Sequence, residues 1–131
     1  MQEIRVAILG LGRVGELFAE HFLEQVQEEG KPVRIVAVAD RNPESPVAMG
    51  FVHSGTPVHS DALEVADKAD EIDIILDLTG NAELRQQLRD KLQAAGNRNT
   101  VIAPESFARL LWCFFDEPSG ALPRVHDHIG Y

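Results

Sequence analysis

Gly10, Gly12 and Gly15 form a short loop between an apolar run and a stretch with helical periodicity. Residues 4–9 (IRVAIL) precede the loop and are typical of a buried strand. Residues 13–28 follow it and carry apolar side chains at the three- and four-residue spacing of an amphipathic helix. The chain is therefore predicted to begin with a strand, a tight glycine turn and a helix.

Strand and helix patterns alternate along the rest of the chain. Short β-branched or apolar runs predict strands, and longer amphipathic stretches that begin at capping residues predict helices. Further strands are expected at 33–39, 57–59, 72–78 and 100–103, and helices at 47–51, 61–69, 82–95 and 105–115. This order predicts an α/β fold of the Rossmann-like, doubly wound kind, with a mostly parallel sheet and helices on both faces.

The length of 131 residues suits one domain with a core of its own. We expect residues 1–115 to form this domain, and residues 116–131, which mix prolines and glycines with charges, to form a C-terminal tail. Cys113 is the only cysteine, which excludes an internal disulfide, and its apolar neighbours predict a buried, inert thiol. The apolar runs are too short to span a bilayer and the start has no small-residue cleavage site, so a cytoplasmic protein is expected.

The formal net charge of −9 limits the classes of partner. Nucleic acids and anionic membrane surfaces are bound through clustered lysines and arginines, and the sequence has no basic run. The charge therefore predicts neither kind of partner, and by itself it identifies no ligand.

Each glycine of the loop has its own physical task in such a turn. Gly10 permits the tight turn, Gly12 lets a pyrophosphate approach the backbone, and Gly15 lets the helix pack on the strand. The first amides of the helix, those of Arg13 and Val14, would point at the anion, and the helix dipole favours negative charge there. The guanidinium of Arg13 would either reach the pyrophosphate or face solvent. The loop indicates a dinucleotide site, with glycines that serve only packing as the alternative.

Asp40 ends the second predicted strand, where a carboxylate can accept hydrogen bonds from the adenosine ribose hydroxyls. It favours NAD, because a carboxylate there would repel the 2′-phosphate of NADP. Arg41 keeps NADP as an alternative, since a guanidinium next to the ribose could pair with that phosphate or stack on the adenine. Another nucleotide, or coenzyme A, is a weaker alternative, because the same loop would hold its phosphates.

Three segments taken together resemble the coenzyme domain of the glucose-fructose oxidoreductase and inositol dehydrogenase family, and of homoserine and aspartate dehydrogenases. They are VAILGLGRVG (6–15), VAVADRNPE (36–44) and IDIILDLTGNAE (72–83). The resemblance implies that Thr79 and Gly80 line the nicotinamide side of the cleft. An ordinary turn and helix cap is the alternative for these two residues.

The resemblance also implies what is missing. In the glucose-fructose oxidoreductase family, the strand after that helix is followed by Glu-Lys-Pro, whose lysine helps the chemistry. Here Ser106 stands at the lysine position, and a serine is a poor replacement for an acid or base. The catalytic residues are therefore unknown, and no counterpart of the C-terminal catalytic domain is expected.

Two other groups of polar residues are candidates for chemistry. Asp73 and Asp77 lie on one face of a predicted strand; a partner for Asp73 and solvent at the strand end for Asp77 are the simpler interpretation, and a functional carboxylate pair is the alternative. His126, Asp127 and His128 offer few ligands, so no metal site is expected.

The helix at 105–115 carries more apolar side chains than one surface helix needs. Its stripe consists of Phe107, Leu110, Leu111, Phe114 and Phe115. Core packing is the first explanation. A homodimer interface, with Trp112 as an aromatic anchor, is the alternative.

Two functions are compatible with these features. The first is a stand-alone nucleotide-binding or sensing module without turnover, and the stretch SFARLLWCFF (106–115) also resembles coenzyme-domain-like modules attached to some bacterial sensor kinases. The second is an NAD(P)-dependent oxidoreductase that completes its active site by oligomerisation or with a partner chain. The short chain and Ser106 favour the first.

Overall fold

The sheet is parallel throughout the described chain. A computed structural model describes residues 2–28 and 30–115. Within these residues, five strands pair in the order β3-β2-β1-β4-β5, and every pair is parallel. The strands are β1 Ile4–Leu9, β2 Val33–Ala39, β3 Val58–His59, β4 Ile74–Asp77 and β5 Val101–Ala103. The order reverses between β1 and β4, and this switch point is where α/β sheets of this kind bind ligands.

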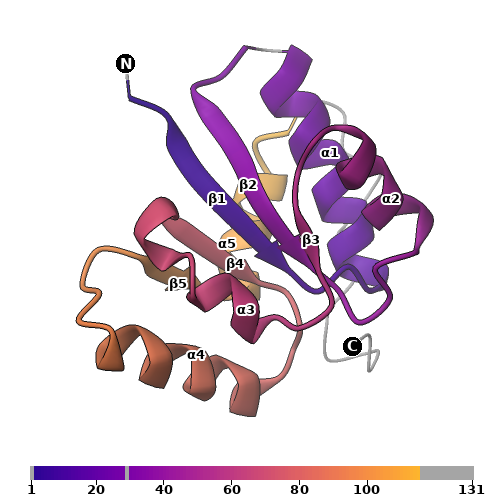
Figure 1. Cartoon of the computed structure of the whole chain (residues 1–131). Helices are drawn as coiled ribbons and strands as arrows, with labels where there is room; N and C mark the ends of the chain where they lie inside the picture. The colour runs from indigo at the N-terminus through magenta and orange to yellow at the C-terminus, as the bar shows by residue number, and fades with distance from the viewer. Residues whose placement is uncertain (1, 29, 116–131) are drawn as a thin grey trace.

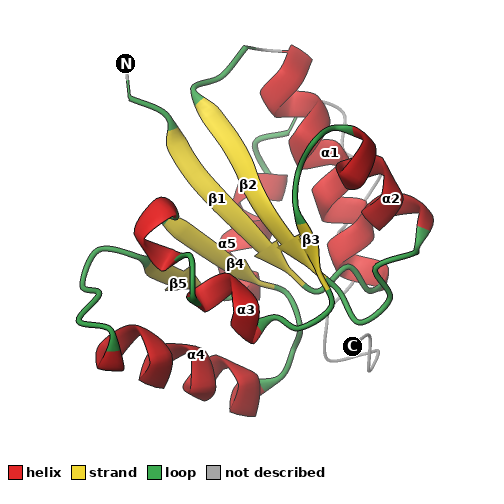
Figure 2. Ribbon diagram, viewed as in Figure 1, coloured by secondary structure: helices red, strands yellow, loops and turns green. Residues whose placement is uncertain are grey.

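Helices cover both faces of the sheet (Figures 1 and 2). One hydrophobic core lies under α1 (Arg13–Glu28), α2 (Pro46–His53) and α5 (Glu105–Trp112). A second core lies under α3 (Leu63–Ala66) and α4 (Ala82–Ala94). A short 3₁₀ helix, Ala69–Glu71, leads into β4. The predicted fold class, a doubly wound Rossmann-like α/β domain, is confirmed.

Successive side chains along a strand point to opposite faces, so one sheet contributes residues to both cores. In β1, Val6 and Ile8 belong to the core under α1, whereas Ala7 and Leu9 belong to the core under α4. Because both faces are covered, the strand reads as a continuous apolar run instead of an alternating one.

An aromatic cluster fixes α1 against the end of the described chain. Phe18 and Phe22 stack on one another with ring centroids 5.4 Å apart, and Phe115 stacks on Phe18 at 5.7 Å. Trp112 is buried beside Phe115 and meets His21 edge-on. The core explanation of the predicted stripe therefore holds for Phe115, and for Phe107 and Leu111, which pack partly buried against this core, but not for the exposed Leu110 and Phe114.

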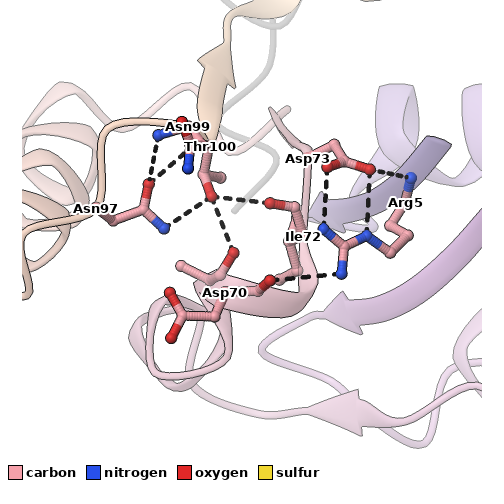
Figure 3. A network of polar contacts seen from close by, with 8 residues as sticks. Arg5, Asp70, Ile72, Asp73, Asn97, Asn99 and Thr100 are labelled. Carbon is pink, nitrogen blue, oxygen red and sulfur yellow. Dashed lines mark hydrogen bonds and ion pairs between the residues drawn. The ribbon is translucent and has the colours of Figure 1, made fainter.

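The amino ends of the strands are held by polar contacts (Figure 3). The Arg5 guanidinium donates to both carboxylate oxygens of Asp73, from Nε at 3.2 Å and from Nη2 at 3.0 Å. The backbone N–H of Arg5 donates to the same carboxylate at 2.8 Å. The Thr100 hydroxyl donates to the carbonyl oxygen of Ile72 at 2.8 Å. These contacts tie β1 and β5 to the residues that precede β4.

Some predicted boundaries were wrong. The single helical turn expected at 47–51 is a longer helix, α2, which Ser45 caps by accepting from the Ala48 amide. The expected helix at 61–69 shortens to α3 and the 3₁₀ turn, and β4 and α5 are also shorter than predicted.

Two predictions about individual side chains were also wrong, and one alternative is excluded. Cys113 is exposed, because α5 turns it away from the core. Trp112 is buried, in keeping with core packing, and it is therefore not the exposed dimer anchor that was the alternative. Asp77 is fully buried, whereas solvent was expected at this strand end.

The predicted tail, 116–131, lies outside the described residues, and so do His126, Asp127 and His128. Over the described ranges, no helix has both the length and the apolar character that crossing a membrane requires. Those ranges also contain no group of three or more histidine, cysteine or acidic residues arranged to hold a metal ion.

Candidate dinucleotide-binding site

The glycine loop lies at the carboxyl end of β1, between that strand and α1. Gly10 has a φ of +90° and donates its amide hydrogen to the carbonyl oxygen of Ala39 at 2.8 Å. A Cβ at Gly10 would lie 3.1 Å from backbone atoms of Leu78 and Thr79. Both the backbone conformation and the close approach of the neighbouring strand therefore require glycine here.

Gly15 is required for a different reason. A Cβ at this position would overlap the carbonyl oxygen of Gly10 and lie 2.8 Å from the carbonyl carbon. The first turn of α1 can therefore pack directly on the loop only because Gly15 has no side chain. Gly12 is half-buried, and its carbonyl oxygen accepts the Glu16 amide at 2.7 Å.

Helix α1 begins at Arg13, immediately after the loop. Val14 is buried against the sheet, whereas Arg13 is exposed at the rim. The amino end of α1 consequently faces the carboxyl edge of the sheet, where its dipole and amides favour an anion.

Asp40 directly follows β2 and lies against the glycine loop. Its side chain is only 5% exposed, and its Oδ1 accepts the Leu11 amide at 3.4 Å. Its own amide donates to the carbonyl oxygen of His59 at 2.9 Å. Burial raises the pKa of this carboxyl, although backbone amides of Leu11, Arg41 and Asn42 oppose the rise.

Glu16 adds a second acidic group to this corner of the site. Burial raises the pKa of the Glu16 carboxyl, and the nearby charges of Asp40 and Glu20 raise it further. Arg41 is exposed at the rim, one residue after Asp40. The corner beside Asp40 therefore carries two carboxyl groups, and the charge of Asp40 opposes the ionisation of Glu16.

A buried polar network forms the other side of the site, at the end of β4. Asp77 is 0% exposed, and its Oδ1 accepts hydrogen bonds from the Thr79 amide at 3.1 Å and the Thr79 hydroxyl at 2.6 Å. Its Oδ2 accepts from Nε of Arg85 at 2.9 Å. The Thr79 hydroxyl oxygen accepts the Asn81 amide at 3.2 Å, and Asn81 caps α4 through the Leu84 amide at 3.0 Å. Gly80, with a φ of +69°, is exposed between them.

The two carboxylates expected on one strand face do not form a functional pair. Asp73 binds Arg5 at the amino end of β4, as a partnered carboxylate was expected to do, and Asp77 binds Arg85 at the carboxyl end. Each aspartate therefore has its own guanidinium, and the strand separates them.

The structure brings the predicted site residues to one edge of the sheet. Gly10, Gly12 and Gly15 adjoin Asp40 on one side and Thr79 on the other. Sequence reasoning missed the roles of Asp77, Arg85 and Glu16. The spacing Asp77-Leu-Thr79 was a usable signal for Asp77, because aspartate side chains commonly accept from the amide two residues on.

The fold and this edge define a dinucleotide-binding domain of the Rossmann type. The family model of the homoserine dehydrogenase NAD-binding domain matches residues 10–102. The chain belongs to this family, and it is an NAD-binding Rossmann domain of the homoserine dehydrogenase type. The resemblance inferred from the three sequence segments is thereby confirmed. A search of curated proteins gives no match.

Solved structures give the same fold. Homoserine dehydrogenase from S. aureus at pH 6.5 is 21% identical with a TM-score of 0.59, over 95% of this chain and 32% of that protein. The enzyme from Thiobacillus denitrificans is 27% identical with a TM-score of 0.53, over 84% and 25%. GenD2 from gentamicin A biosynthesis, solved in complex with NAD, is 21% identical with a TM-score of 0.51, over 78% and 27%. The chain therefore spans about a third or less of the length of these proteins.

Proposed function

We propose that this chain binds NAD(H) at the glycine loop and prefers it to NADP(H). The contact between Asp40 and the loop carries the proposal, because it places a buried carboxylate beside the amide of Leu11, where the adenosine ribose of a dinucleotide would lie. The amides of Arg13 and Val14 would face the pyrophosphate. Thr79 and Gly80 would lie on the nicotinamide side, across the switch point from Asp40.

The preference for NAD follows from charge. A 2′-phosphate on the ribose would bring up to two negative charges next to Asp40 and Glu16, whose carboxyl pKa values are already raised by burial and, for Glu16, by repulsion from Asp40. Arg41 at the rim would offset part of this repulsion, as Arg13 would for the pyrophosphate. Two inner carboxylates outweigh one exposed guanidinium, because exposed charges are screened by solvent.

The domain is further proposed to hold the coenzyme without supplying an acid or base for turnover. The chain has three lysines, and Lys31, Lys68 and Lys91 all lie toward the amino ends of the strands, away from the glycine loop. Near the end of β5, the carboxylate of Glu105 accepts from Nε of Arg109 at 3.1 Å within its own helix. The second candidate is an oxidoreductase whose catalytic acid and base come from outside this domain. The similarity in fold to dehydrogenases favours this candidate.

Calorimetric titration with NADH, NADPH and coenzyme A tests the binding site. We expect NADH to bind most tightly, and we expect Gly12→Val to abolish binding. Asp40→Ala should lower the affinity for NADH and reduce the difference in affinity between NADH and NADPH. Arg98→Ala, far from the loop at the opposite edge of the sheet, is the control. Tighter binding of coenzyme A, or the same NADH affinity in folded Gly12→Val, would refute the proposal.

We also propose that a second copy of the chain covers the outer side of α5. Leu110 and Phe114, one helical turn apart, are 54% and 77% exposed, which is unusual for neighbouring large apolar side chains on a monomer. Sedimentation equilibrium should give a dimer that Phe114→Glu dissociates and that Val52→Glu, on the exposed side of α2, leaves intact. A wild-type monomer at micromolar concentration would refute this interface.

The last proposal concerns the domain boundary. Residues 1–115 are proposed to be the binding unit, because the glycine loop, Asp40 and Thr79 lie within them and Phe115 packs into the same core, where it stacks on Phe18 and Phe22. Residues 116–131 would then be a tail that the site does not need.

A further inference from the structure

The ion pair between the buried Asp77 and the partly exposed Arg85 calls for an explanation beyond packing. Asp77 is completely buried at the end of β4, and a buried carboxylate is costly unless its charge and its hydrogen-bonding capacity are both satisfied. Arg85 supplies the opposite charge at 2.9 Å, and Thr79 supplies two donors. An apolar side chain at this position would avoid the desolvation penalty altogether.

The location of the network suggests what it does. Asp77 is the register partner of Leu9, the last residue of β1, and the next residues on each strand form the two sides of the switch point. The Leu78 amide donates to the Leu9 carbonyl at 2.9 Å, and the backbone of Leu78 and Thr79 passes so close to Gly10 that a Cβ there would lie at 3.1 Å. The backbone of the turn after β4 therefore lies directly against the backbone of the glycine loop.

Asp77 determines the shape of that turn. Its Oδ1 holds both the amide and the hydroxyl of Thr79, and the Thr79 oxygen in turn accepts the Asn81 amide. Gly80, between these two fixed residues, has a left-handed backbone and is exposed at the carboxyl edge. Thr79 is consequently held directly by the fully buried Asp77, and Asn81 is held indirectly, through the Thr79 hydroxyl.

In a doubly wound sheet, each half of the sheet binds one of the two nucleotide halves of a dinucleotide. Asp40 follows β2, so the adenosine half lies over β1, β2 and β3, and the turn after β4 faces the other half. We propose that Asp77, with Arg85 as its counter-ion, is a positioning residue that presents the Thr79–Asn81 turn to the nicotinamide half of the coenzyme. This inference rests on the proposed NAD site.

Comparison of NADH with ADP-ribose tests it, because ADP-ribose retains the adenosine and pyrophosphate groups and lacks only the nicotinamide ring. In Asp77→Asn the side chain keeps its shape and loses its charge. We expect the dissociation constant for NADH to rise by about tenfold, the loss expected for one buried hydrogen bond to a charged group, and that for ADP-ribose to stay within about threefold. Asp90→Asn, an exposed change of the same charge on the outer side of α4, should alter neither.

Threonine variants keep the test decisive if Asp77→Asn does not fold. Thr79→Val removes the hydroxyl with little change of volume and should weaken NADH selectively, whereas Thr79→Ser retains the hydroxyl and should bind like wild type. Equal weakening of NADH and ADP-ribose, or unchanged affinity for both in folded variants, would overturn the positioning role while the proposed site stands. A wild-type protein that binds neither compound would overturn the proposed site and this inference together.

Discussion

Gly15 and Gly50 differ sharply in the steric contacts that an added methyl group would make. At Gly15 a Cβ overlaps the Gly10 carbonyl oxygen, and neither backbone segment can move without disturbing β1 or α1. At Gly50, inside α2, a Cβ has nothing within 4 Å. One position therefore requires glycine for close packing, and the other has glycine without a steric reason.

We predict that Gly15→Ala destabilises the protein by about 3 kcal/mol or more, because the overlap is with backbone and cannot be relieved by a rotamer change. Gly50→Ala should stabilise it by about 0.5–1 kcal/mol, since alanine is the better helix former. Chemical denaturation of both variants measures the two effects. Similar stability of Gly15→Ala and wild type would show that the loop does not pack on α1 as described.

Asp40 gives the pH dependence of stability a definite sign. Burial raises the pKa of its carboxyl, so its favourable contribution is present below the unfolded-state pKa and is lost as pH rises through the folded-state pKa. At neutral pH the ionised carboxylate therefore reduces the free energy of unfolding in the protein without ligand.

Asp40→Asn should consequently raise the melting temperature at pH 7. This gain should shrink as pH falls through the raised folded-state pKa and should be gone near the ordinary pKa of aspartate, about 4. The same variant should bind NADH more weakly, which separates the stability of the domain from its affinity. Glu44→Gln, an exposed carboxyl in the next loop, is the control for charge alone. A lower melting temperature for Asp40→Asn at pH 7 would contradict this account.

Among the elements, those that hold the site were predictable from local patterns. The β1 to α1 unit and β2 have the predicted bounds, since their apolar residues repeat with the strand or helix period. The errors fall where tertiary contacts decide length. The helix from Leu63 ends after one turn, and α2 gains its first turn from the cap at Ser45.

The network around Asp77 was not predictable in the same way. Thr79 is two residues away and could be guessed, but the partnership with Arg85 depends on how α4 returns over β4. Burial of Asp77 likewise depends on β1 and β5 lying on either side of it. Sequence periodicity identifies the strand, whereas the pairing of its buried Asp77 with Arg85 can be recognised only in the assembled fold.

The pairing of β1 with β4 carries its own pH dependence. Hydrogen bonds from Arg5 lower the pKa of the Asp73 carboxyl, so the contribution is present above the unfolded-state pKa and is lost as pH falls through the folded-state value. Asp73→Asn should therefore reduce stability at pH 7, and the difference from wild type should close in acid. Because both side chains are partly exposed, the effect should be small and should weaken in high salt.

Thermal melts between pH 2 and 7 measure this effect. Glu3→Gln is a matched control, because the Glu3 carboxylate lies 3.9 Å from Arg34 and both side chains are more than half exposed. If Asp73→Asn and Glu3→Gln behave alike, the Arg5 contact does not contribute to the pairing of β1 with the residues before β4.

For the whole molecule, the test of the proposed boundary is truncation. Removal of residues 116–131 should change the affinity for NADH by less than about twofold and leave cooperative unfolding intact, because the described core already includes Phe115. Calorimetry and denaturation of the shortened chain measure both quantities. Removal of residues 112–131, which also deletes Trp112 and Phe115, should abolish cooperative unfolding. If the chain without residues 116–131 no longer binds NADH, part of the site lies beyond residue 115.

The close approach of Gly10, Gly15 and Thr79 also limits how this protein can evolve. Side chains are excluded from the contact between β1, α1 and the end of β4, so substitutions there cannot adjust affinity by small steps. Gradual change is confined to the rim, where Arg13 and Arg41 are exposed. Selection for a different coenzyme would therefore act first on these rim positions, and a library for redesign should vary them while the three backbone contacts stay constant.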